Sequence, residues 1–237
     1  MNPCEKTGVF YFLLRVYTAV KRSDESRTDM NSRFNLYVRS GMRSRLDGWL
    51  DQALSAFELA RNFAYDQSQR SLVWAQIGFT YLRMLEREKA AYAFQLSHMN
   101  AAWSQDHYRI LEAECNRALM LLEKEQYANA NRLALSVLDE AERIGRPDLV
   151  SFVHVVARTQ TALYKVGKLD RSEALYWIER EVKEFISVES SSDELLLRTW
   201  REGIIRSHQD LYGIRAALEV VRSFRRVRNE MRQRTTH

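Results

Sequence analysis

The feature that most constrains this chain is the spacing of its apolar residues, which recur at helical intervals almost without interruption after residue 33. An apolar residue at every third or fourth position lies on one face of a helix. Gly145, Pro147 and Gly167 break the pattern, and Asp193 offers an N-cap to a later apolar run. The pattern predicts ten helices, at about 33–45, 48–64, 68–84, 87–100, 104–123, 127–144, 148–165, 169–187, 193–208 and 213–232.

Composition favours an all-α fold and excludes several other classes. The 237 residues include 8 Gly and 2 Pro, too few for the turns of a many-stranded sandwich or barrel, and no segment predicts a strand. With 46% hydrophobic residues the chain can bury a core. Cys4 and Cys115 alone cannot form a disulfide framework or a cysteine-based zinc site. This cysteine usage is typical of a reducing compartment, so we expect a cytoplasmic protein.

The N-terminal residues predict a segment separate from the helical array. The apolar run Val9–Val20 contains Arg15 and is too short to span a bilayer of about 30 Å, so we expect no membrane span. It also lacks a signal-peptide cleavage site. Residues 21–31 are polar. We therefore expect an N-terminal apolar helix plus a polar connection over 1–32, a helical repeat domain over 33–233 and a disordered tail over 234–237.

A repeated signature indicates how the helices pair. Six residues carry it, with a close contact of two helices expected at the glycine and the alanine and large side chains filling the space between hairpins: Trp74, Ile77, Gly78, Tyr81, Ala90 and Phe94. The signature resembles the tetratricopeptide repeat (TPR). Weaker copies place a small residue of the second helix at intervals of 37, 40, 42 and 45 residues, at Ala53, Ala90, Ala130, Ser172 and Ala217.

These intervals exceed the usual TPR length, so the chain resembles the degenerate, long-helix TPR domains of bacterial sensory and regulatory proteins. The resemblance implies an all-α, right-handed TPR-like α-solenoid of about five antiparallel hairpins, or about ten to eleven helices. It also suggests a bacterial or phage origin. The TPR motif is structural, so it specifies the fold far more than the function.

No group of residues predicts catalysis, a cofactor or a metal site. The five His have no metal-ligand spacing and are expected to be ordinary surface residues, and no phosphate-binding Gly-rich loop occurs. Neighbouring carboxylates lie two residues apart and therefore point to different sides of a helix. We expect them to be solvated or ion-paired with Arg109, Arg117, Arg143 and Arg180. Cys115 is expected in the core.

The resemblance implies a partner-binding groove lined by the first helix of each hairpin. The TPR spacing assigns these residues to it: Met42, Arg45, Leu72, Phe79, Leu82, Arg83, Leu119, Leu122, His154, Tyr164 and Arg206. Its apolar middle and basic far end would suit an amphipathic helix or a hydrophobic peptide with an acidic end. The alternative is that some of these side chains pack against neighbouring helices.

The formal net charge of +5 lies at one end of the chain. Residues 215–234 contain seven Arg and two Glu, and the remaining charges balance. We consider three roles for this segment: a solvated cap, a surface for an acidic protein, or a phosphate-binding patch. The basic residues concerned are Arg222, Arg225, Arg226, Arg228 and Arg232.

The sequence therefore favours a non-enzymatic scaffold that binds a protein or peptide and acts as a regulator, adaptor or anti-activator. Two alternatives remain open. One is a regulator that binds nucleic acid through its Arg-rich C-terminal helix, and the other is a sensor that responds to a small signalling peptide, as quorum and phage regulators do. We also consider a homodimer through the terminal helices, with apolar residues such as Trp200 at the contact.

Overall fold

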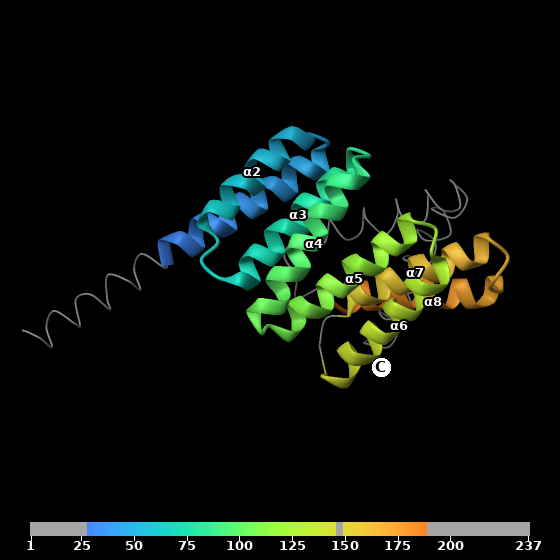
Figure 1. The fold of residues 1–237 in the computed structure, drawn as a ribbon. Helices are drawn as coiled ribbons and strands as arrows, with labels where there is room; N and C mark the ends of the chain where they lie inside the picture. Colours follow the sequence, from blue (N-terminus) through green and yellow to red (C-terminus); the bar gives the residue numbers. More distant parts are fainter. Residues whose placement is uncertain (1–27, 146–148, 189–237) are drawn as a thin grey trace, which may run out of the picture.

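The structure, a computed structural model, describes residues 28–145 and 149–188, and within this part the chain is entirely helical, with no strand (Figure 1). A first helix covers 28–47. Seven more follow: α2 (Leu50–Phe63), α3 (Gln67–Arg83), α4 (Arg87–Ser104), α5 (His107–Glu123), α6 (Tyr127–Arg143), α7 (Val150–Lys165) and α8 (Arg171–Val188). These bounds confirm the eight helices predicted up to residue 187. The predicted helices at 193–208 and 213–232 lie outside the described residues.

The first helix extends further towards the N-terminus than the sequence predicted. Residues 28–32 are helical, although they were expected in the polar connection. Asp29 forms an ion pair with Arg33 at 3.1 Å, one helical turn later. Asn31 accepts a hydrogen bond of 2.9 Å from Gln69 of α3. Both contacts stabilise this helical turn despite its polar sequence.

Consecutive helices pair as antiparallel hairpins: 28–47 with α2, α3 with α4, α5 with α6, and α7 with α8. Along the array, α5 also contacts both α3 and α7, the first helices of the neighbouring hairpins. The first helices therefore lie side by side as one layer, which is the arrangement of a TPR-like array. The hairpins follow one another in chain order (Figure 1).

Each first helix ends at a residue with left-handed backbone: Gly48, Leu85, Glu125 and Gly167. At α3, the Leu85 N–H donates to the carbonyl of Leu82 and the next N–H donates to the carbonyl of Tyr81. These two hydrogen bonds form a Schellman motif, which satisfies the last carbonyls of a helix and turns the chain back. Asp66 and Asp106 cap the other ends, accepting hydrogen bonds from backbone N–H groups in the first turns of α3 and α5.

The TPR-like signature residues take the positions that their chemistry predicts. A Cβ atom added to Gly78 would lie 2.7 Å from the ring of Phe94, so only glycine fits against this ring. The first hairpin repeats the contact, with 2.6 Å between such an atom on Gly41 and the ring of Phe57. The weaker copy predicted for this hairpin began only at Gly48 and did not include Gly41. Counting back from Phe57 by the interval that separates Gly78 from Phe94 would have found it.

The register assigned to the fourth hairpin was wrong by two residues. In the first three hairpins the fully buried alanine lies five residues after the left-handed residue, at Ala53, Ala90 and Ala130. The same count predicted Ser172, which is exposed, whereas Ala174 is buried. The cause is the turn after Gly167, because α8 begins four residues after it while α2, α4 and α6 begin two residues after theirs.

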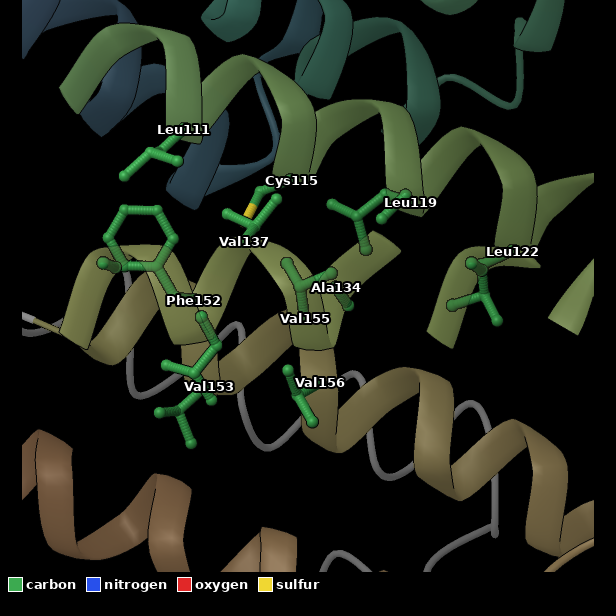
Figure 2. Close-up of a cluster of buried hydrophobic side chains, with 14 of the residues drawn as sticks. Leu111, Cys115, Leu119, Leu122, Ala134, Val137, Phe152, Val153, Val155 and Val156 are labelled. Atoms are coloured by element: carbon green, nitrogen blue, oxygen red, sulfur yellow. The ribbon is translucent and has the colours of Figure 1, made fainter. Parts of the chain in front are cut away.

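Two clusters of buried side chains form the core. One joins helix 28–47 to α2, α3 and Ala93 of α4, with Phe34, Phe57 and Ile77 at its centre. The other joins α5, α6 and α7, where Leu111, Val137 and Phe152 point toward one another (Figure 2). The described part of the array thus has two hydrophobic clusters and not one central core, and each cluster connects neighbouring hairpins.

Candidate partner-binding surface

The first-helix layer, formed by helix 28–47 with α3, α5 and α7, carries all the described residues that the sequence assigned to a groove. Burial divides these residues into two groups. Met42, Leu72, Phe79, Leu82, Arg83, His154 and Tyr164 are partly exposed, and Arg45, Leu119 and Leu122 are buried. Arg206 and the basic patch formed by Arg222, Arg225, Arg226, Arg228 and Arg232 lie outside the described residues.

Arg45 connects the first hairpin to the second from a buried position, with 7% of its surface exposed. Its guanidinium donates hydrogen bonds of 3.0 and 2.7 Å to the backbone carbonyl and the side-chain oxygen of Gln76. It also lies over the rings of Phe57 and Phe79, at 5.6 and 5.9 Å from their centroids. Burial, and then repulsion by Arg83, lowers the pKa of Arg45 to about 10, so it stays charged at neutral pH.

The apolar residues of α3 differ in how much surface they leave for a partner. Leu72 packs against the first core cluster, together with Met42. Phe79 packs against the second cluster and meets Phe94 edge-on at 5.1 Å. Leu82 is partly exposed and belongs to neither cluster. Of the apolar residues assigned to α3, Leu82 is therefore the one that a partner can cover with least disturbance to the core.

On α5, the residues assigned to the surface are packing residues. Leu119 and Leu122 are 5% and 6% exposed and belong to the cluster shared with α6 and α7 (Figure 2). These two residues therefore fit the alternative interpretation, in which some of the assigned side chains pack against neighbouring helices. Both leucines lie on the side of α5 that packs against α6 and α7, and the periodicity of α5 by itself does not reveal that contact.

Polar contacts join the N-terminal ends of α3 and α5. Ser68 donates a hydrogen bond of 2.8 Å to Asp106, and Arg109 donates one of 3.3 Å to Ser68. Burial opposes ionisation of Asp106, but the bonds from Ser68 and from the Arg109 backbone outweigh it and hold the pKa of Asp106 below its usual range. One turn along α5, burial raises the pKa of Glu112 against the opposing effect of Arg109. This end of the layer is therefore polar, and its polar side chains largely form hydrogen bonds with one another.

The described histidines take part in contacts that the sequence did not predict, although the side chains of His98 and His107 remain 40% and 57% exposed. Each contacts a glutamate of another helix: His98 and Glu114 at 2.7 Å, His107 and Glu140 at 3.1 Å, and His154 with the buried Glu181. These pairs join α4 to α5, α5 to α6, and α7 to α8. They were missed because the partners lie 16 to 33 residues apart in the chain.

The expected contacts between arginines and glutamates are confirmed for four pairs, whereas Glu181 is buried and contacts His154 instead. Arg109 contacts Glu112, Arg117 contacts Glu114, Arg143 contacts Glu140, and Arg180 contacts Glu142. The first three lie within one helix at a spacing of three residues, so local periodicity was sufficient to predict them. Arg180 instead connects α8 to α6.

The described residues offer little reactive chemistry. Burial, with the negative charges of Glu112 and Glu114, raises the pKa of the Cys115 thiol, which therefore stays protonated and unreactive. Within residues 28–145 and 149–188, no three His, Cys, Asp or Glu side chains gather closely enough to hold a metal ion. Among the helices of the same part, none is long and apolar enough to cross a membrane.

Comparisons with known proteins add little to this description. No family model matches the chain, and no curated protein matches it. Two similar structures are of the nearly identical TPR-like repeats of a kinesin light chain from Podosopora anserina, one of them carrying a single substitution. They are 16% and 15% identical, cover 87% and 86% of this chain and 98% and 97% of their own, and have TM-scores of 0.48. Because these likenesses are remote, the TPR-like fold rests on the helix pairing and on the packing of Gly41 and Gly78.

Proposed function

We propose that this protein is an interaction scaffold that binds a peptide or a helix of another protein on its first-helix layer, and that it acts as a regulator or adaptor. The observation that carries the proposal is the partly exposed apolar surface of α3 beside a basic group, formed by Leu72, Leu82 and Arg83. The first helices lie side by side, so an extended partner can contact several of them at once.

The chemistry of this surface favours an amphipathic partner. Leu72 and Leu82 offer apolar contacts, and an exposed lysine, Lys165, ends α7. A helix with an apolar stripe and acidic residues near one end would cover the leucines and bring its carboxylates to Arg83 or Lys165. The guanidinium of Arg45 contacts Gln76 and two aromatic rings, so we expect Arg45 to hold helix 28–47 against α3 and not to bind the partner itself.

Several observations support a scaffold over the alternatives. The protonated Cys115 and the arginine–glutamate pairs speak against a reactive centre on α5 and α6. A phosphate-binding surface needs arginines that are not already neutralised, but many in the described part contact carboxylates, including Arg33, Arg61, Arg87, Arg117 and Arg180. These paired arginines therefore give no support to the nucleic-acid alternative, which was based on the arginines of residues 215–234.

The test is a selection of peptides from a displayed random library, followed by affinity measurement on variants. We expect the selected peptides to share an apolar helical stripe and acidic residues. Leu82→Glu should weaken their binding at least about tenfold, since it buries a charge against the apolar stripe. The matched control is Leu59→Glu, which places the same charge on an exposed leucine of the second helix α2 and should leave affinity unchanged.

Circular dichroism of both variants shows whether they remain helical. Equal binding to the wild type and to a folded Leu82→Glu variant would contradict the proposed surface. So would equal losses from the two substitutions.

A further inference from the structure

The exposed side of α4 differs in charge from the other second helices that the structure describes, α2, α6 and α8. Residues 90–104 contain no Lys, Arg, Asp or Glu, in a chain of which 28% is charged. Their solvent-facing side instead carries four large apolar residues: Tyr92, Leu96, Met99 and Trp103. We refer to these four residues as the α4 stripe.

The α4 stripe is a continuous surface that no described helix covers. Tyr92, Met99 and Trp103 are 63%, 40% and 65% exposed, and Leu96 between them is partly exposed. Their spacing of four, three and four residues places all four side chains on one face of the helix. Aromatic residues and methionine without charges are the composition of an interface centre, whereas solvated helix faces are rich in Lys and Glu.

The equivalent positions of the other hairpins show that this composition is not a property of the repeat. Counted from the buried alanine, α6 carries Arg132, Ser136, Asp139 and Arg143 where α4 carries the stripe. The same positions of α8 carry Tyr176, Arg180, Lys183 and Ser187. In the first hairpin the equivalent positions are Ser55, Leu59, Asn62 and Asp66, of which only Leu59 is apolar. Hairpin packing therefore does not require an apolar residue at any of the four positions.

We infer that the α4 stripe is a self-association surface on which a second copy of this chain packs, with the two α4 helices antiparallel. The spacing of the stripe is symmetric about its midpoint. A two-fold axis there places Tyr92 opposite Trp103 of the second copy and Leu96 opposite Met99 of the second copy, so each stripe residue meets another.

The lack of charge favours a second copy over a charged partner. In a two-fold contact any charged group near the axis faces its own duplicate, and like charges across an interface are unfavourable. The stripe carries no such group. It also lacks the basic residues that draw a helix to an anionic membrane surface.

The size of the stripe sets the expected strength of the dimer. A stable complex of standard size buries about 800 Å² on each partner, and one helix face with four large side chains supplies only part of that area. We therefore expect a reversible dimer with a dissociation constant in the micromolar range. Because α4 is a second helix, this contact leaves the first-helix layer accessible.

Sedimentation equilibrium of the full chain over roughly 1–200 µM tests the inference. The wild type should shift from the mass of one chain to the mass of two. Met99→Lys should weaken the dimer at least about tenfold, because it places an unpaired charge against Leu96 of the second copy. Ser136→Lys, the same charge on the exposed side of α6, should dimerise like the wild type. Circular dichroism checks that each variant is folded.

A mixture of two variants tests the identity of the partner and the register. Leu96→Glu and Met99→Lys should each be monomeric alone, and together they should form a heterodimer because the new Glu and Lys face each other. A wild type that stays monomeric over the whole range overturns the inference, and it would mean that the stripe is covered by the apolar segment 9–20 or by a different protein. A dimer unaffected by Met99→Lys, or a mixture that stays monomeric, also overturns it.

Discussion

At the scale of single residues, the functional assignment depends on which side chains are free and which hold the array together. Arg45 illustrates the difference. Its sequence position suggested a ligand for a partner, yet its guanidinium is buried between two rings and bonded to Gln76. Leu82, one hairpin further along and predicted by the same spacing, remains partly exposed. Repeat spacing predicts the face on which a residue lies, and the neighbouring hairpin decides whether that face is open.

Arg45→Ala should lower the free energy of unfolding by about 2–4 kcal/mol, because it removes two hydrogen bonds and leaves a void between Phe57 and Phe79. The measurement is urea unfolding followed by circular dichroism. Arg43→Ala, at an exposed position of the same helix, should change the free energy by less than about 0.5 kcal/mol. Similar losses for the two variants would mean that Arg45 does not connect the hairpins.

At the scale of elements, the turns explain both the success and the failure of sequence prediction. Helix positions were predictable because apolar periodicity is local, and the signature from Trp74 to Phe94 was predictable because close packing requires Gly78. The fourth hairpin was misaligned because its turn after Gly167 is longer, and Ser172 and Ala174 are both small residues. The His–Glu contacts between helices were missed because they depend on how the hairpins stack.

The left-handed turn at Leu85 gives a prediction for stability. Leu85 has a φ of 63° and is 83% exposed, so its side chain contributes strain without much burial. Leu85→Gly should raise the free energy of unfolding by about 1 kcal/mol. The reverse change at the equivalent turn, Gly167→Leu, should lower it by about 1–2 kcal/mol. Thermal unfolding checks both signs, and a destabilised Leu85→Gly variant would contradict the Schellman geometry.

The corrected register of α8 is also directly testable. Ala174→Arg should cost at least about 3 kcal/mol, because the new side chain has no room and its charge would be buried. Ser172→Arg should be nearly neutral, since Ser172 is exposed. Comparing the two variants by chemical unfolding distinguishes the registers. The opposite order of stabilities would restore the alignment that the sequence suggested.

At the scale of the whole molecule, the two layers of the array have different proposed roles. The first helices lie side by side and offer a surface to an extended partner, whereas the α4 stripe lies on a second helix and is proposed to bind another copy. The two core clusters join neighbouring hairpins, so a partner that spans several first helices would stabilise contacts along the array. A dimer through α4 would present two such layers and increase the avidity for a repeated partner.

Hydrogen–deuterium exchange, with and without a saturating peptide from the library selection, tests the central claim most directly. A partner that binds the folded array slows the opening of the helices that it contacts. Exchange should slow in helix 28–47, α3 and α7, with the largest change around Leu82 and little change on the second helices. Protection confined to α2, α4 and α6, with none on the first helices, would contradict it.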